Sequence, residues 1–167
     1  MKTFKYNFFA KFIYRYANVP ANLILLFYLL ISVLGLNEDW KFIFPLIINL
    51  ILLYVLNKFY IKIYKSFPFK FEVDNEKMIC SDFMINNRET IIKFSSIKEI
   101  KGGIFSGRAY MPLYIQTDKT EMGISPHLTD FNKLLTIILT NINKELYELL
   151  LEAIKKIAHD NTPKNKK

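Results

Sequence analysis

The chain has 167 residues, of which 51% are hydrophobic and 16% aromatic, and its formal net charge is +8. This apolar content is unusual for a soluble domain, and the single cysteine excludes an internal disulfide and a cysteine-cluster metal site. Residues 1–65 hold eight basic and two acidic residues, so most of the excess positive charge precedes the later, mixed-charge part of the chain. This distribution argues against nucleic acid as a partner, because nucleic-acid-binding proteins carry a basic face on a folded domain.

The first sixteen residues, MKTFKYNFFAKFIYRY, have the pattern of an imperfect amphipathic helix. Lys11 and Arg15 lie beside a broad apolar arc on the helical wheel, and Lys5 falls inside it. The arc is formed by Phe8, Phe9, Phe12, Ile13 and Tyr16. We therefore expect residues 1–18 to form a cytoplasmic interfacial segment on the inner leaflet, or alternatively a frayed extension of the next helix.

Two apolar runs follow, at about 19–36 and 42–61, and the polar island 37–41 separates them. At about 1.5 Å rise per residue, each run spans most of a roughly 30 Å hydrocarbon core. A buried soluble hairpin can be equally apolar, but the roughly 100 remaining residues are too few to wrap two such helices. A signal peptide fits poorly, because no small-residue cleavage pattern follows the first run. We therefore predict a two-helix transmembrane hairpin over 19–64.

Basic residues flank this hairpin on both sides, whereas the island contains one basic and two acidic residues. The positive-inside rule therefore places both termini in the cytoplasm and the island outside. We expect the cations nearest the membrane to contact the headgroups of anionic lipids, each contributing ~1 kcal/mol. These candidate contact residues are Lys11, Arg15, Lys58, Lys62 and Lys65.

Three polar residues lie within the predicted spans, namely Asn22, Ser32 and Asn49. Asn49 is the costliest to bury, and we expect it to bond a backbone carbonyl or a polar group on the first helix. Three uncharged groups are few for an ion or substrate path. They nevertheless leave open a small transporter or channel subunit that acts as an oligomer.

After Pro68 the pattern changes to the alternation of strands. Residues 67–74 and 77–81 predict an antiparallel pair, and Pro112 predicts an edge position or a bulge. Further strands are expected at 83–85, 89–94, 102–106, 110–117 and 121–125, with turns at 86–88, 107–108 and 118–120. Thr129 is a candidate N-cap for a C-terminal helix with a break near 141–143. We expect a disordered basic tail over 159–167.

This arrangement resembles the bacterial pleckstrin-homology-like membrane proteins of the YcxB-like kind. The resemblance lies in 69-FKFEVDNEKMICS-81, 90-TIIKFSSIKEI-100 and 122-MGISPHLTDFNKLLTIIL-139, and Phe94 stands where that family commonly has Trp. It implies a membrane α-helical hairpin plus an α+β pleckstrin-homology-like domain over 65–158, an antiparallel sheet or partial barrel capped by a C-terminal helix. It also implies a multi-pass protein of the bacterial inner (plasma) membrane. The family has no established reaction.

The sequence contains no Walker A loop, dinucleotide fingerprint or HExxH motif, so we predict no catalytic, cofactor-binding or metal-binding residues. His127 and Asp130 form the clustered acid–base pair that leaves a lipid-acting enzyme open, although a surface histidine at a helix entry is the preferred interpretation. Gly102-Gly103 and Gly107-Arg108 suggest an anion cradle or, preferably, a bulge and a turn. Cys80 is expected to be a partly buried strand residue.

We therefore predict a non-enzymatic integral membrane protein. Its cytoplasmic domain would associate with an unknown protein partner, with lipid headgroups of the anionic inner leaflet, or with itself as a homo-oligomer. No cofactor is expected.

Overall fold

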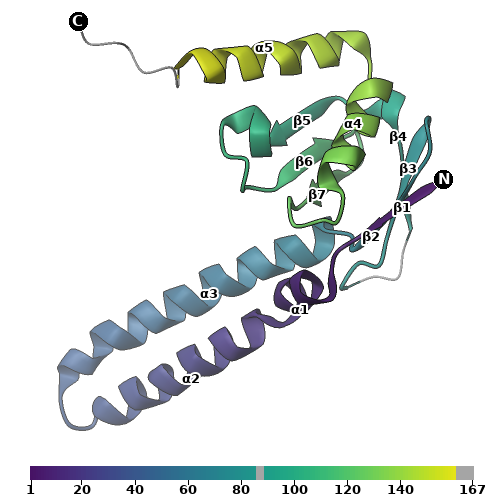
Figure 1. The fold of residues 1–167 in the computed structure, drawn as a ribbon. Coiled ribbons are helices and arrows are strands. Elements are labelled where there is room, and N and C mark those ends of the chain that lie inside the picture. The colour runs from purple at the N-terminus through teal and green to yellow at the C-terminus, as the bar shows by residue number, and fades with distance from the viewer. Residues whose placement is uncertain (86–88, 161–167) are drawn as a thin grey trace, which may run out of the picture. The chain divides into compact units, whose positions relative to one another are not determined.

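The computed structural model of the protein describes residues 1–85 and 89–160 (Figure 1). The chain divides into a helical unit, Phe8–Lys65, and a strand-rich unit, which comprises Met1–Asn7 and the chain from Ser66 onward. The predicted turn at 86–88 and the tail at 161–167 lie outside the described residues.

The helical unit contains α1 (Phe8–Tyr16), α2 (Asn18–Gly35), the short 3-10 helix η1 (Trp40–Phe42) and α3 (Ile43–Ser66). Among the described residues, two helical segments are long and apolar enough to cross a membrane, Phe8–Gly35 and Trp40–Ser66. The two predicted apolar runs are therefore confirmed as helices. The second helix continues past the run to Ser66, through the last basic residues of the unit.

The polar island forms a compact turn between α2 and α3. The Asp39 carboxylate accepts the backbone N–H of Lys41 at 2.9 Å and caps η1. Gly35 packs directly against the Phe42 ring. A Cβ added at this glycine would come within 2.5 Å of a ring carbon. A glycine at this position allows the end of α2 and η1 to approach closely.

Within the described part of the strand-rich unit, the strands form two antiparallel sheets. The first has the order β1-β2-β3-β4, made of β1 (Lys2–Lys5), β2 (Lys70–Val73), β3 (Lys77–Ser81) and β4 (Thr90–Lys93). The second has the order β5-β6-β7, made of β5 (Glu99–Gly102), β6 (Leu113–Gln116) and β7 (Glu121–Ile124). The 3-10 helix η2 (Phe94–Ser96) follows β4, and η3 (Gly103–Ser106) follows β5.

The N-terminal residues differ from the predicted interfacial helix. Lys2–Lys5 pair antiparallel with β2, and the helix begins only at Phe8. Phe4 and Tyr6 are buried while Thr3 and Lys5 are exposed, which is the two-residue period of a strand. The Tyr6 hydroxyl accepts the backbone N–H of Ser125 at 2.8 Å, and Tyr6 also forms a bridge with Leu128. The first residues of the chain are thus part of the strand-rich core.

The alternation predicted after Pro68 is confirmed in β2 and β3. Their inward side chains are fully or almost fully buried, namely Phe71, Val73, Met78 and Cys80. Residues 83–85 form no strand, and the strand expected at 102–106 ends at Gly102. Gly102 and Gly103 both have positive φ, so the chain leaves the extended conformation there and enters η3. The strand after Pro112 begins at Leu113.

The C-terminal part contains α4 (Phe131–Asn141) and α5 (Lys144–Asp160), which runs at a steep angle to α4 (Figure 1). The predicted break near 141–143 is confirmed, because Ile142 has an extended backbone. The position that caps α4 is Asp130 with a φ of 57°, rather than the predicted Thr129, whose backbone N–H donates to the Lys5 carbonyl. Because α5 continues to Asp160, residues 159 and 160 are helical and do not belong to the tail in which they were expected.

Candidate functional site

The five predicted headgroup-contact residues all lie in the helical unit, at the end opposite the turn. Lys11 and Arg15 are on α1, and Lys58, Lys62 and Lys65 are on the last turns of α3. The end of α3 lies beside the start of α2, because the Tyr64 hydroxyl is 2.9 Å from the Arg15 carbonyl oxygen and 2.7 Å from Asn18 Oδ1. We call these five cations the basic end of the helical unit.

Aromatic side chains lie along α1 next to this basic end. The rings of Phe8 and Phe12 stack with centroids 6.4 Å apart, and the rings of Phe12 and Tyr16 lie 5.3 Å apart. These three residues are 85%, 52% and 45% exposed within a helix whose buried residue is Ala10. We call them the aromatic ridge. A helix with an exposed apolar face and basic residues beside it is typical of an interfacial segment.

Positive and negative charges are segregated along the helical unit. Its two acidic residues, Glu38 and Asp39, lie in the turn, where Asp39 pairs with Lys41 at 3.7 Å. At the basic end, the Lys58 ammonium lies 5.7 Å from the centre of the Tyr54 ring. The basic end therefore presents cations without a carboxylate of its own unit among them.

An amide pair joins the two long helices near the basic end. Asn57 Nδ2 donates to Asn22 Oδ1 at 2.8 Å, and Asn22 Nδ2 donates to Asn57 Oδ1 at 3.3 Å. Sequence reasoning identified Asn22 but missed Asn57. The signal was present, because the two residues are nearly equidistant in sequence from the centre of the turn and must face each other in an antiparallel hairpin.

The other polar residues of the long helices bond to their own helix. Ser32 Oγ donates to the Tyr28 carbonyl at 2.8 Å, and Asn49 Nδ2 donates to the Pro45 carbonyl at 2.9 Å. The expected bond from Asn49 to a backbone carbonyl is therefore confirmed. Because Asn22, Ser32 and Asn49 each have a separate partner, their side chains do not converge on a common site.

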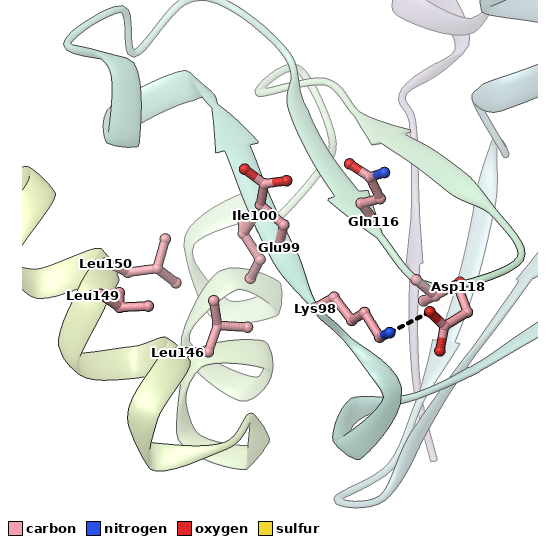
Figure 2. A pocket seen from close by; sticks show the side chains of 9 residues that line it. Lys98, Glu99, Ile100, Gln116, Asp118, Leu146, Leu149 and Leu150 are labelled. Atoms are coloured by element: carbon pink, nitrogen blue, oxygen red, sulfur yellow. Dashed lines mark ion pairs between the residues drawn. The ribbon is translucent and has the colours of Figure 1, made fainter.

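The strand-rich unit has a groove of about 580 Å³ between the sheet of β5 and β6 and the helix α5 (Figure 2). One wall consists of leucines from the first turns of α5, of which Leu149 is 58% exposed. The other wall is mostly polar and includes the ion pair of Lys98 with Asp118. The groove is lined by Lys98, Glu99, Ile100, Gln116, Thr117, Asp118, Leu146, Leu149 and Leu150. Local sequence patterns give no signal for it, because its walls are about 30–50 residues apart in the chain.

His127 and Asp130 have different partners. His127 Nδ1 lies 3.1 Å from Ser125 Oγ, which also accepts the His127 backbone N–H at 3.2 Å. The Asp130 carboxylate pairs with Lys133 at 3.0 Å. Ser125 is fully buried, so its hydroxyl and His127 stabilise the turn after β7. This geometry fits a structural turn.

The glycines near η3 form a closed loop. Gly102, Gly103 and Gly107 all have positive φ. The backbone N–H of Gly107 donates to the Ile104 carbonyl at 3.3 Å, and that of Arg108 donates to the Gly103 carbonyl at 3.1 Å. These two N–H groups are bonded within the loop, so the local geometry favours a turn over an anion cradle.

Cys80 is 0% exposed in β3, which is deeper than the partial burial expected. Burial raises the pKa of its thiol far above the ordinary value and so disfavours the reactive thiolate while the domain is folded. Cys80 is thus a core side chain and an internal reporter of unfolding.

The resemblance to the YcxB-like family stays a prediction based on the segments quoted for it. No family model matches the chain, and no curated protein or solved structure matches it significantly.

Proposed function

We propose that this chain is a non-enzymatic, two-span protein of the bacterial inner membrane. It would hold a pleckstrin-homology-like domain at the cytoplasmic face for association with a protein partner or a second copy. The observation that carries the proposal is the exposure of the apolar side chains on the two long helical segments. In the most apolar 18-residue stretch of each segment, only 6% and 0% of the residues are buried. Core helices of soluble proteins are mostly buried, and apolar surface in water costs about 25 cal/mol per Å². Lipid would cover this surface.

The pairing of β1 with β2 supports an even number of membrane crossings. These strands come before and after the helical unit, yet they belong to one sheet. This pairing supports a topology in which both ends of the helical unit lie on the same side of the membrane. The pairing also argues against a cleaved signal sequence, because cleavage after the first apolar helix would remove β1 with the buried residues Phe4 and Tyr6.

The strand order supports the pleckstrin-homology-like interpretation. Among the described residues, antiparallel sheets of four and three strands precede α4, as expected for a partial barrel closed by a C-terminal helix. Phe94 is 1% exposed and begins η2 after β4, at the position where the resemblance implies a turn with an aromatic residue. The helical unit is then an insertion between the first two strands of the domain.

Short connections would keep this domain at the membrane surface. Tyr6 and Asn7 join β1 to α1, and residues 67–69 join α3 to β2. At about 3.5 Å per residue, these connections reach only roughly 7–14 Å. An anchored domain with a partly apolar groove suits a binding role more than catalysis.

Cysteine labelling in cells tests the insertion and its orientation. Native Cys80 is buried and reacts only when the domain opens, so brief labelling reports Glu38→Cys in the turn and Lys119→Cys in the β6–β7 turn, with the unmutated chain as the background. We expect a membrane-impermeant maleimide to label Glu38→Cys in intact cells and Lys119→Cys only after permeabilisation. Alkaline carbonate should leave the protein in the membrane pellet. Release by carbonate would overturn the insertion, and external labelling of Lys119→Cys would overturn the orientation.

A further inference from the structure

We infer that the basic end and the aromatic ridge together form one binding site for anionic phospholipids, with α1 lying in the plane of the headgroups. This inference rests on the proposed membrane insertion and names the ligand class of that membrane surface. Its parts are two sets of cations separated by more than 40 residues of sequence, on α1 and on the end of α3.

Charge determines the class of ligand. The basic end carries five cations, and the two carboxylates of the helical unit lie at the opposite end in the turn. Each cation near an anionic leaflet contributes about 1 kcal/mol, which is about fivefold in affinity. A zwitterionic headgroup offers no net charge and gains little from this arrangement.

The aromatic ridge determines how α1 meets the lipid. Phe8 is 85% exposed and Phe12 is 52% exposed, while Lys11 and Arg15 on the same helix are partly buried. An apolar ridge flanked by cations fits the boundary between acyl chains and headgroups, where the rings contact the chains and the cations reach the phosphates. Free phosphate would use the cations but leave the ridge in water.

Tyr64 makes the two sets of cations a single site. Its hydroxyl is within hydrogen-bond distance of the Arg15 carbonyl and the Asn18 side chain, so it holds the end of α1 against α3 next to Lys62 and Lys65. Tyr64 is therefore a positioning residue. Tyr64→Phe removes this contact without changing a charge.

Lipid retention by the full chain in detergent, measured by native mass spectrometry, tests the inference. We expect phosphatidylglycerol to be retained at least tenfold more than phosphatidylcholine with the same acyl chains. The triple variant Lys58→Gln/Lys62→Gln/Lys65→Gln should lose this preference, and Tyr64→Phe should weaken it. The matched control Lys144→Gln/Lys155→Gln/Lys156→Gln removes three charges from exposed positions of α5 and should keep it.

Equal retention of the two lipids by the wild type, or an unchanged preference in the triple variant, would overturn the inference. Displacement of phosphatidylglycerol by millimolar inorganic phosphate would show that the site recognises free phosphate, which also overturns it. Carbonate extraction and labelling of Glu38→Cys in the same variants report membrane insertion. A protein that is inserted but does not prefer anionic lipid refutes this inference alone.

Discussion

Replacing Tyr6 by Phe removes one hydroxyl and leaves one buried amide without its partner. Tyr6 is 7% exposed and Ser125 is 0% exposed, and the Tyr6 hydroxyl accepts the Ser125 backbone N–H at 2.8 Å. An unsatisfied buried N–H costs about 1–3 kcal/mol, so the strand-rich unit should open about 5–150-fold more often in the variant. The ring remains, so its edge-to-face contact with Phe69 at 5.6 Å is kept. The change therefore tests the hydrogen bonding of the Tyr6 hydroxyl, which connects the N-terminus to the strand-rich core.

The thiol of Cys80 provides the assay. It is the single cysteine of the chain and is fully buried in β3, so a maleimide dye reacts with it only after the domain opens. When reclosing is fast, the labelling rate follows the population of the open form. Tyr110→Phe is the matched control, because it removes the same hydroxyl from a residue that is 72% exposed. Equal labelling rates for Tyr6→Phe, Tyr110→Phe and the wild type would refute the assignment of the N-terminal strand to the domain.

Three further changes test other contacts. Gly123→Ala should destabilise the strand-rich unit by about 1–3 kcal/mol in the Cys80 labelling assay, because the new Cβ would overlap the Phe67 ring; unchanged labelling would contradict this packing. Asn22→Ala and Asn57→Ala should show a coupling of about 0.6 kcal/mol in a double-mutant cycle on unfolding in bilayers, and additive effects would exclude the amide pair. Two backbone N–H groups hold the pKa of the Asp74 carboxyl below its ordinary value of 3.8, so its stabilisation is present above that pH and is lost as the pH falls through the lowered pKa. Acid unfolding should thus be less steep in Asp74→Asn, and identical pH profiles would refute the contribution.

Strong local patterns made much of the fold predictable. The charge-free runs before and after the polar island gave the two long helices, since no other local structure suits such segments. The alternation from Phe69 to Val73 gave the buried faces of β2 and β3. The change of period and the weak helix formers near Asn141 gave the helix pair at the C-terminus. In each case the deciding information lies within one segment of the chain.

The missed features depend on contacts between distant residues. β1 has only four residues, and its pattern fits a helical wheel about as well as a strand; its partner Val73 is 71 positions away from Lys2. Gly102 and Gly103 were expected to continue a strand. Both residues have a positive φ, and the strand therefore stops there. For the candidate site, the five cations were identified from their positions in the sequence. Tyr64, which joins their two segments, and the groove beside α5 required the folded chain.

The position of β1 also has a consequence for biosynthesis. The ribosome makes Lys2–Lys5 first, but their partner strand β2 follows only after the whole helical unit. At 5–20 residues per second, the delay is roughly 3–13 s. In the topology proposed above, the N-terminal strand would wait in the cytoplasm without its partner during this time, while the hairpin inserts. Closing the loop then becomes less costly, because a paired hairpin brings its two ends together. Under the proposed topology, correct insertion would be a precondition for completing the sheet, and a misinserted hairpin would leave β1 exposed to quality-control proteases without its partner strand.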